Sequence, residues 1–308
     1  MTQKPRIVVV GSSNTDMVVK SARIPAPGET VLGGEFVMAA GGKGANQAVA
    51  AARLGADVWF VARVGDDLFG RTAIENFRHE GICVDYVTKD PRKPSGVALI
   101  LVDQRGENVI SVAPGANSEL SPDDVRKARS AIEQADVMII QLEVPLETVA
   151  EAARLGADTG AVVILNPAPA QALDDRLLRN VTVLTPNETE TELLTGLSLR
   201  GPAERLTAAR QLTLRGVRTV VMTLGGSGSF LFVGESGVVV PTVKIQPVDT
   251  TAAGDAFNGA LAVALAEGQE LEQAVRFANL AGASAATRLG AQPSLPTRAE
   301  VEELERWS

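Results

Sequence analysis

The sequence contains very little of the residue types that serve most nucleophilic and metal chemistry. Among its 308 residues there is one histidine, His79, and one cysteine, Cys83. One cysteine cannot close a disulfide within the chain, and together the two residues cannot fill a structural zinc site. A single histidine also leaves little room for a nucleophile–base constellation. Any chemistry must therefore depend on carboxylates, amides, hydroxyls, lysines and backbone N–H groups.

Basic clusters and long apolar runs are scarce as well. The 29 Lys and Arg residues are outnumbered by 37 Asp and Glu residues, for a net charge of −8, so neither nucleic acid nor an anionic membrane is expected as a partner. No apolar run approaches the roughly 20 residues of a membrane span. The four apolar residues Ile7–Val10 are too few for a signal-peptide core. We therefore expect a cytoplasmic protein, and local N–H groups still allow a small anionic ligand.

Short β-branched runs alternate with Ala- and Leu-rich helical stretches over most of the chain. Several runs are apolar at consecutive positions, as in parallel strands buried on both faces. The expected strands of a main sheet are Ile7–Val10, Val58–Val64, Val137–Leu142, Val162–Leu165, Val181–Leu184, Val220–Leu224, Phe230–Val233 and Val238–Val243. The expected helices include Ala45–Leu54, Leu68–Glu80, Pro122–Ala135, Leu146–Leu155, Pro202–Arg215 and Ala256–Glu267. The alternation predicts an α/β fold with a doubly wound, mostly parallel central sheet and helices on both faces.

Two segments break this alternation, because each has two strand-like runs with no helix between them. The runs are Met17–Val19 and Val31–Met38 in the first segment, and Val97–Val102 and Val109–Val112 in the second. We expect these insertions, at about 13–40 and 95–113, to pair into a small β-sheet. That sheet would form a lid over the carboxyl ends of the parallel strands, where ligands bind in such folds. Residues 1–308 are predicted to form one domain.

A glycine-rich motif, Gly41-Gly-Lys-Gly-Ala-Asn46, leads into an expected helix. It is not a P-loop, because Val37 stands where the first glycine is needed and a glycine follows Lys43. Its glycines would let a ligand approach the backbone closely, with Lys43 and Asn46 as polar partners. A tight turn into a helix explains the same residues equally well.

A second motif, Asp249-Thr-Thr-Ala-Ala-Gly-Asp255, opens another expected helix. Exposed N–H groups and the helix dipole make this turn a candidate anion site. A carboxylate beside such a site needs a reason. One reason is catalytic, with Asp255 accepting a hydroxyl proton while neighbouring N–H groups hold phosphoryl oxygens. The alternative is that Asp255 only caps the helix.

A third motif, Thr185-Pro-Asn-Glu-Thr-Glu190, follows an expected strand. Asn187, with Glu190 three residues later, has the pattern of a capping box. The same side chains at a strand end would also suit contacts to a nucleotide phosphate and a hydrated Mg²⁺. The motif alone leaves both interpretations open.

A fourth motif, Thr223-Leu-Gly-Gly-Ser-Gly228, lies between two apolar runs. A glycine-rich hairpin explains it, and a loop around a nucleotide is the alternative. Asn14, Asp16 and Glu143 also follow strand-like runs. Each is typical of a turn or cap, but together they would bring three polar groups to strand ends, where they could hold a polyol.

The combination of these elements resembles the ribokinase family of carbohydrate kinases. The resemblance runs nearly end to end, and Gly41–Gln47 and Asp249–Asp255 are its most specific parts. The other matching segments are Gly11–Asp16, Pro27–Thr30, Thr185–Glu188 and Gly290–Pro293. The resemblance implies ATP-dependent transfer of the γ-phosphoryl group to the 5-hydroxyl of D-ribose, giving ribose 5-phosphate and ADP.

The resemblance also implies roles for individual residues. Asp255 would be the base, with anion-hole amides from Ala252, Ala253 and Gly254. The sugar would be held by Asn14, Asp16, Gly42, Lys43, Asn46, Glu143 and Asp255. The ATP site would be formed by Asn187, Glu190, Thr223, Gly225, Gly226, Gly228, Gly254 and Asn279, with Glu190 near Mg²⁺.

Two further features follow from the resemblance. Members of the family are activated by K⁺, and the matching loop residues are Asp249, Thr251, Ala285, Arg288, Gly290 and Ser294. Several of them would act through backbone carbonyls, which makes their side-chain identity less important. The lid commonly forms a dimer interface in this family, so a homodimer is expected.

Other activities on the same fold are the nearest alternatives. They are a deoxyribokinase, a fructokinase and a nucleoside kinase such as adenosine kinase. A nucleoside kinase should offer an aromatic in the lid to stack on the base, and Phe36 is the only aromatic of the two lid segments. A non-catalytic sugar-binding protein would be expected to lack Asp255 or Gly254, yet both are present. A nicotinamide-dependent oxidoreductase is disfavoured because no dinucleotide fingerprint follows Ile7–Val10.

Overall fold

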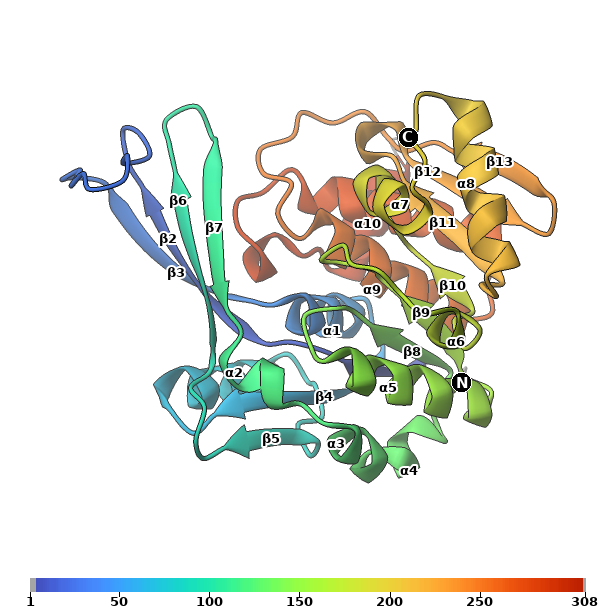
Figure 1. Cartoon of the computed structure of the whole chain (residues 1–308), viewed down its shortest axis with the longest axis horizontal. Coiled ribbons are helices and arrows are strands. Elements are labelled where there is room, and N and C mark those ends of the chain that lie inside the picture. Colours follow the sequence, from blue (N-terminus) through green and yellow to red (C-terminus); the bar gives the residue numbers. More distant parts are fainter. Residues whose placement is uncertain (1–3, 307–308) are drawn as a thin grey trace.

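A mostly parallel sheet forms the centre of the molecule, with β1 (Arg6–Val10) in its interior (Figure 1). The computed structural model describes residues 4–306, and within that range the sheet has nine strands in the order β13-β12-β11-β10-β9-β8-β1-β4-β5. The other strands are β4 (Asp57–Gly65), β5 (Val87–Asp90), β8 (Val137–Ile140), β9 (Val162–Leu165), β10 (Val183–Leu184), β11 (Thr219–Thr223), β12 (Ser229–Val233) and β13 (Ser236–Val240). The pairings β11–β12 and β12–β13 are antiparallel, and the other pairings of this sheet are parallel. The predicted α/β class is confirmed.

Helices cover both faces of this sheet. On one side pack α1 (Lys43–Arg53), α2 (Leu68–His79), α9 (Ala253–Ala266), α10 (Leu271–Ala285) and α11 (Arg298–Arg306). On the other side pack α3 (Pro122–Lys127), α4 (Arg129–Ile132), α5 (Leu146–Thr159), α6 (Asp175–Leu178), α7 (Glu188–Thr195) and α8 (Pro202–Leu214). Ile7 and Val9 belong to the first hydrophobic cluster and Val8 and Val10 to the second, and all four are fully buried. Two covered faces therefore explain why the strand is apolar at consecutive positions.

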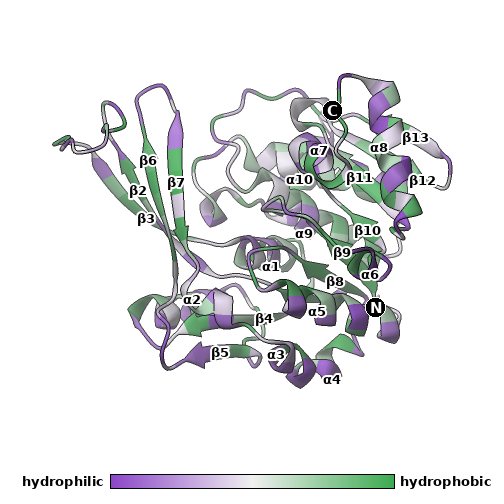
Figure 2. Cartoon of the chain, in the orientation of Figure 1, coloured by the Kyte–Doolittle hydropathy of each residue, from purple (hydrophilic) through white to green (hydrophobic). Residues whose placement is uncertain are grey.

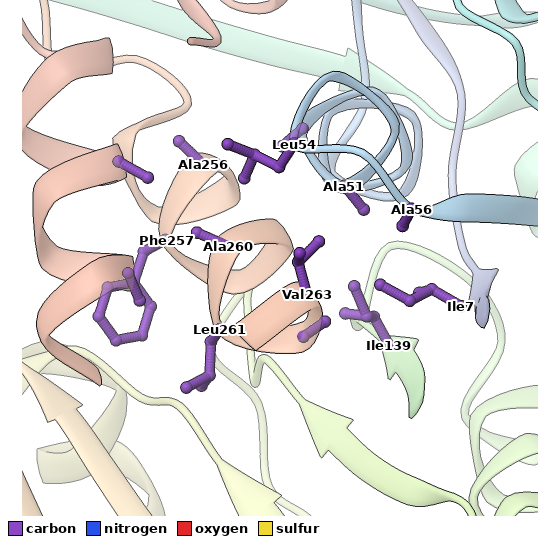
Figure 3. Close-up of a cluster of buried hydrophobic side chains, with 14 of the residues drawn as sticks. Ile7, Ala51, Leu54, Ala56, Ile139, Ala256, Phe257, Ala260, Leu261 and Val263 are labelled. Carbon is purple, nitrogen blue, oxygen red and sulfur yellow. The ribbon is translucent and has the colours of Figure 1, made fainter. Parts of the chain in front are cut away.

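The helices α1 and α9 pack closely against one another. Figure 3 shows Ala51 of α1 and its C-cap residue Leu54 in one buried cluster with Ala256, Ala260 and Val263 of α9. Gly259 makes the approach possible, because a Cβ there would lie 2.6 Å from the Cβ of Ala50. The packing sets the first turns of both helices beside each other at one edge of the sheet.

The two predicted insertions form the expected small sheet. Its strands are β2 (Asn14–Lys20), β3 (Glu35–Gly41), β6 (Gly96–Val102) and β7 (Asn108–Ala113), in the order β3-β2-β6-β7. Both hairpins are antiparallel, and β2 and β6 pair in parallel. The sheet stands beyond the carboxyl end of β1, on the side where α1 begins (Figure 1). The prediction of a lid made from these two segments is confirmed.

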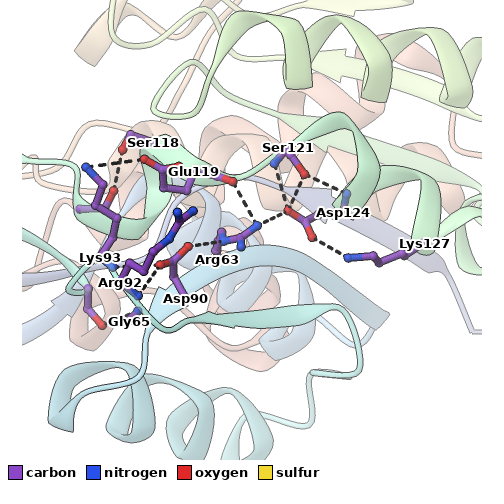
Figure 4. A network of polar contacts seen from close by, with 12 residues as sticks. Arg63, Gly65, Asp90, Arg92, Lys93, Ser118, Glu119, Ser121, Asp124 and Lys127 are labelled. Carbon is purple, nitrogen blue, oxygen red and sulfur yellow. Dashed lines mark hydrogen bonds and ion pairs between the residues drawn. The ribbon is translucent and has the colours of Figure 1, made fainter.

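A polar network holds the base of the lid. Arg63 of β4 donates to Asp90 (2.9 Å), to Asp124 (2.8 Å) and to the carbonyl of Glu119 (3.2 Å) (Figure 4). Glu119 ends the 3₁₀ helix η1 (Gly115–Glu119), which follows β7. The carboxylates of Asp90 and Asp124 are almost fully buried. Their charged hydrogen bonds to the Arg63 guanidinium therefore hold η1 against β4.

One predicted helix is wrong. The range Pro122–Ala135 forms two short helices, α3 and α4, that meet at Ala128. Ala128 is fully buried and its N–H donates to Val125, three residues back (3.0 Å), so the α-helical ladder is interrupted there.

Two expectations about the whole chain stay predictions. No helix within residues 4–306 combines the length and the apolar character that a membrane crossing needs, and the cytoplasmic location stays a prediction. The single domain was predicted for residues 1–308, of which 1–3 and 307–308 lie outside the described residues.

Candidate active site

The predicted sugar-binding residues gather at the carboxyl ends of β1 and β8. Asn14 begins β2 shortly after β1, Glu143 follows β8, and Lys43 is the first residue of α1. Strands β1 and β8 are neighbours in the sheet, and the next strand of the main sheet along the chain lies on opposite sides, β4 beside β1 and β9 beside β8. This is the topological switch point, where the loops diverge and leave room for a ligand.

Gly42 allows α1 to start directly against the link between β1 and β2. It is the N-cap of α1 and has φ 90°, a conformation that favours glycine. A Cβ at Gly42 would lie 2.7 Å from the backbone nitrogen of Asn14. The N–H of Ala45 donates to the carbonyl of Ser12 (2.8 Å). The motif is thus a tight turn into a helix, and this turn brings Lys43 and Asn46 beside Asn14.

The carboxylate of Glu143 is anchored on one of its oxygens. Its Oε2 accepts from the hydroxyl of Ser12 (2.5 Å) and from the backbone N–H of Lys43 (3.0 Å). Asn14 is held in a comparable way, because Asn117 of η1 donates to its Oδ1 (2.8 Å). The Asn14 Nδ2 is therefore the end of that amide left to meet a ligand.

The carboxylate of Asp255 is buried and held on both oxygens. Its Oδ2 accepts from Asn46 (2.9 Å) and its Oδ1 from Gln47 (2.8 Å), both on α1. Asp255 does not cap α9, whose N-cap is Ala252 and which has no side-chain cap hydrogen bond. The helix-cap interpretation of Asp255 is wrong.

Charge and burial shift the pKa values of the groups around Asp255. Burial, helped by the carboxylates of Glu143 and Asp255, raises the pKa of Asp16 to about 6. Burial also raises the pKa of Asp255, although Lys43, Asn46 and Gln47 act to lower it. Burial lowers the pKa of Lys43, but the carboxylates of Asp255, Glu143 and Glu190 outweigh this and the net shift is upward. The site therefore joins one cation to several carboxylates.

The turn before α9 has the geometry of an anion site. Ala252 has φ 60° and is the one non-glycine residue with positive φ within residues 4–306. Such a left-handed residue at a helix start directs successive N–H groups into one concavity. The N–H of Ala253 donates to the carbonyl of Thr250 (3.2 Å), so an anion bound here would compete with that long hydrogen bond.

A cavity of about 470 Å³ opens beside this turn. The predicted nucleotide-site residues that line it are Thr223, Gly225, Gly226, Gly228, Gly254 and Asn279, together with Ala253. The glycines belong to the turn between β11 and β12, so the hairpin interpretation is confirmed and the turn also forms a cavity wall. The amide of Asn279 accepts from Ser229 (2.6 Å) and donates to Val240 (3.0 Å), which fixes its orientation in the wall.

Asn187 and Glu190 form the predicted capping box at the start of α7. Glu190 accepts from the backbone N–H of Asn187 (2.8 Å) and from its Nδ2 (3.0 Å). Burial raises the pKa of Glu190, so its charge would gain from a nearby cation. Within residues 4–306 no group of three acidic, His or Cys side chains could hold a metal ion by itself. A single carboxylate such as that of Glu190 fits an Mg²⁺ ion that keeps most of its waters and binds phosphate oxygens.

The predicted cation-loop residues come from two adjoining segments. The backbone N–H of Val248 donates to the carbonyl of Ala286 (2.8 Å), and that of Gly290 donates to Asp249 (2.9 Å). Burial raises the pKa of Asp249, but hydrogen bonds from Thr251 and Gly290 outweigh it and the net pKa is lowered. The guanidinium of Arg288 donates to Glu300 (2.7 Å). Hydrogen bonds around the Asp249 carboxylate and the Ala286 carbonyl thus join the two segments that carry the predicted K⁺ residues.

Comparison with known proteins identifies the family. Residues 4–298 match the model of the pfkB family carbohydrate kinases. The chain belongs to this family. It is a ribokinase-like carbohydrate kinase and hence a phosphotransferase.

Several relatives of this pfkB kinase resemble it over nearly their full length. A ribokinase of Haemophilus influenzae is 43% identical over 96% of this chain and 97% of its own length. A deoxyribokinase of Salmonella typhi is 38% identical over 96% and 97%, respectively. The solved structure of an Arabidopsis thaliana ribokinase complexed with ribose and ATP superposes with a TM-score of 0.91, at 34% identity, over 99% of this chain and all of the other.

Sequence reasoning missed some residues of this kinase that line or support the site. These residues are Gln47, which donates to Asp255, and Gln141 and Asn166, which are both hydrogen-bonded to Gln47. The last two directly follow β8 and β9, and a polar residue at the end of a buried apolar run was the available signal. The cavity is also lined by Thr242, Val243, Lys244, Ile245 and Pro247. Their segment forms neither a helix nor a strand, so it lacks the hydrophobic periodicity by which such elements are predicted from sequence.

Proposed function

We propose that this kinase transfers the γ-phosphoryl group of ATP to the 5-hydroxyl of D-ribose. The observation that carries the proposal is the position of Asp255. Its carboxylate belongs to the same turn as Gly254, which lines the nucleotide cavity, and it is hydrogen-bonded to Asn46 of the predicted sugar site. A proton acceptor between an anion-binding turn and a polar pocket suits phosphoryl transfer to an alcohol.

The polar pocket is suited to a neutral polyhydroxyl compound. The carboxylates of Asp16, Glu143 and Asp255 can accept hydrogen bonds from sugar hydroxyls. Their negative charge would repel a substrate that already carries a phosphate. The Oδ1 of Asn46 is buried without a hydrogen-bond partner. Such an atom costs free energy unless a ligand satisfies it, and a sugar hydroxyl would do so.

Asp255 would align the hydroxyl and accept its proton. Because the transition state of phosphoryl transfer is loose, the proton leaves late and alignment matters more than basicity. Asn46 and Gln47 hold both carboxylate oxygens, so the acceptor is oriented before substrate binds. We assign the N–H groups of Ala252, Ala253 and Gly254 to the transferred phosphoryl oxygens, with α9 contributing its dipole.

The remaining roles concern nucleotide and cations. We propose that ATP occupies the cavity lined by the residues of the β11–β12 turn and Asn279, with Asn187 near its phosphates. Mg²⁺ would neutralise phosphate charge, and Glu190 would accept hydrogen bonds from its water ligands. K⁺ would be held near Asp249, Thr251, Ala285, Arg288, Gly290 and Ser294, where it would stabilise the neighbouring anion-binding turn.

The nearest alternative is a deoxyribokinase, since a relative of that name is 38% identical. The two substrates differ by one hydroxyl, and a site built to hydrogen-bond a hydroxyl discriminates strongly against its loss. The abundance of acceptors in this pocket favours ribose. A nucleoside base would need an aromatic side chain in the lid to stack on. Phe36, the one aromatic residue of the two lid segments, is 63% exposed and lies on the lid face opposite to Asp16, so the pocket fits a nucleoside less well.

The decisive test is a substrate panel. ADP release would be measured with ribose, 2-deoxyribose, fructose and adenosine, each with K⁺ and with Na⁺, and the phosphorylated carbon would be located by NMR. We expect the highest kcat/KM for ribose, phosphate on carbon 5, and faster turnover in K⁺. No ADP release with ribose would overturn the proposal, and a higher kcat/KM for 2-deoxyribose would replace it with the alternative.

The pKa of Asp16 predicts a pH dependence of sugar binding. With a pKa of about 6, its carboxylate becomes protonated as the pH falls through 6, and its charged acceptor is lost. We expect the KM for ribose to rise below pH 6 more steeply than kcat falls. The unfolded chain takes up this proton only near pH 3.8, so folding itself is not weakened by this group between those values. A KM that stays constant between pH 5 and 7.5, or an equal slope in Asp16→Asn, would contradict this.

We further propose that the kinase forms a homodimer through its lid. Neighbouring residues on paired strands share a face, and the register places Phe36, Met38, Leu99 and Val109 on the lid face opposite to Asp16. Each of these four is more than half exposed, and Figure 2 shows how strongly hydrophobic the lid strands are. A second copy would bury this face.

Replacing Leu99 with Lys is therefore expected to yield monomers. A charge in the middle of the apolar face would have to be buried without a partner on dimerisation. Light scattering after size exclusion would report the mass of the wild-type protein, of Leu99→Lys and of the control Leu214→Lys, which alters an exposed leucine at the end of α8. Equal masses for all three proteins would refute the lid interface.

A further inference from the structure

A row of buried polar side chains follows the ends of three neighbouring strands. The residue directly after β8 is Gln141, the one directly after β9 is Asn166, and the one directly after β10 is Thr185. All three are less than a tenth exposed. None has a role in sugar, nucleotide or cation binding in the function proposed above, so their burial calls for another explanation.

Gln47 joins this row to the candidate base. It is fully buried in α1, and its Nε2 donates to Asp255 (2.8 Å) and to Asn166 (3.2 Å). Its Oε1 accepts from the Nε2 of Gln141 (2.6 Å). If the Gln47 amide were turned over, its oxygen would face the Asp255 carboxylate and its nitrogen would face the Gln141 nitrogen. The Nε2 of Gln141, together with the acceptor oxygens of Asp255 and Asn166, therefore favours the orientation in which the Gln47 N–H meets Asp255.

The row continues back to α9. Asn166 donates to the carbonyl of Thr185 (3.2 Å), and the Thr185 hydroxyl is 2.6 Å from Oδ1 of Asn258. Asn258 in turn donates to the carbonyl of Gly254 (2.8 Å). The hydrogen bonds thus connect strand ends with both Asp255 and the glycine that precedes it. Connected hydrogen bonds of this kind strengthen one another and restrain the groups that make them.

We propose that Gln47 is a positioning residue for phosphoryl transfer, and that Gln141 acts through it by keeping the Gln47 N–H, rather than its carbonyl, against Asp255. The inference rests on the proposed role of Asp255 as the base. Gln47 touches neither substrate nor nucleotide in this proposal. It restrains rotation of the carboxylate and leaves the outer lone pairs directed at the pocket.

The charged surroundings make the effect measurable as a pH dependence. Asp255 is faced by Lys43 of α1, Glu143 after β8, Asp16 of β2 and Glu190 of α7. Burial raises the pKa of Asp255, and the hydrogen bond from Gln47 opposes that rise. Removing the Gln47 N–H should therefore move the acid limb of the kcat profile to higher pH.

The test replaces Gln47 with Met, which has a similar size and no donor. We expect kcat to fall roughly 10- to 100-fold, as for loss of a hydrogen bond to a charged group, with the KM for ribose within about threefold. The acid limb should move upward. The matched control is Gln211→Met on α8, whose side chain donates only to the carbonyl of Thr195 (3.2 Å) and should leave kcat and the pH profile unchanged.

Gln141→Met provides a second variant in which Gln47 and Asp255 are intact. It should lower kcat by a smaller factor, and the double variant Gln47→Met/Gln141→Met should be no slower than Gln47→Met alone, because Gln141 acts through Gln47. Thermal unfolding of each variant would show that it is folded. Independent, multiplicative losses in kcat would refute the action through Gln47.

The outcomes separate the two proposals. A wild-type enzyme that releases no ADP with any sugar overturns the proposed function itself. A wild-type enzyme that phosphorylates ribose, with a Gln47→Met variant that keeps its kcat and acid limb, overturns only the positioning role. A variant with raised KM and unchanged kcat would also overturn it, because Gln47 would then serve sugar binding.

Discussion

Replacing Asp255 by Asn is expected to lower kcat by about 10²- to 10⁴-fold, the range that general base catalysis supplies. Asn has no acceptor basic enough for the hydroxyl proton. It also presents an NH₂ group to one of two amide donors, since Asn46 and Gln47 each donate to a different oxygen of Asp255. Sugar affinity should change much less, because most of the predicted sugar contacts lie on other residues.

The measurement pairs ADP release with calorimetric titration of ribose. Asp158→Asn is a suitable control, because this aspartate is exposed on α5 and pairs only with Arg154 at its own surface. We expect the control to keep wild-type kcat and the Asp255 variant to bind ribose within a few-fold. Turnover of Asp255→Asn near the wild-type rate would remove Asp255 from the mechanism.

Replacing Gly42 by Ala is expected to cost both stability and activity. The residue has φ 90°, and its new Cβ would lie 2.7 Å from the nitrogen of Asn14 and 2.9 Å from Cα of Ser13. Backbone strain and overpacking each cost about 1–3 kcal/mol. Because Asn14 and Lys43 would be pushed apart, kcat/KM for ribose should fall about 100-fold.

Gly55→Ala is the matched control at the other end of the same helix. Gly55 follows the C-cap of α1 and has φ 103°, but a Cβ there meets nothing within 4 Å. It should lose only the strain energy of roughly 1–2 kcal/mol and keep its kcat/KM. Urea unfolding and steady-state kinetics would be measured on both variants. Equal effects at the two positions would mean that crowding at Gly42 contributes nothing.

The sequence predicted the central sheet well because its signal is local. Ile7 to Val10 are apolar in succession, and this pattern follows from hydrophobic clusters on both faces. The lid hairpins were predicted from a local signal as well. Two strand-like runs with no helix between them are close enough in the chain to pair as an antiparallel hairpin. The break at Ala128 was missed because it depends on burial against the sheet rather than on the residues on either side.

The candidate site was predicted only in part. Motifs that follow strands or open helices located Asp255, Lys43, Asn46 and Glu190 at one edge of the sheet. Their interactions were not predictable. Asp255 was open to interpretation as a helix cap, and its hydrogen bonds to α1 exclude that. The wall of the candidate nucleotide cavity between Thr242 and Pro247 has no regular structure and so carried no pattern.

The sequence by itself determined that the chain has an α/β fold with a lid, that it has only one histidine and one cysteine, and which acidic and glycine-rich motifs form the candidate site. Only the tertiary structure decided how those groups act on one another. Gln47 and Asp255 are 208 residues apart in the chain, yet one hydrogen bond of 2.8 Å joins them. The raised pKa of Asp16 likewise comes from burial and from carboxylates on other elements. Orientation and charge in a buried site depend on neighbours brought together by folding, and a local pattern does not record them.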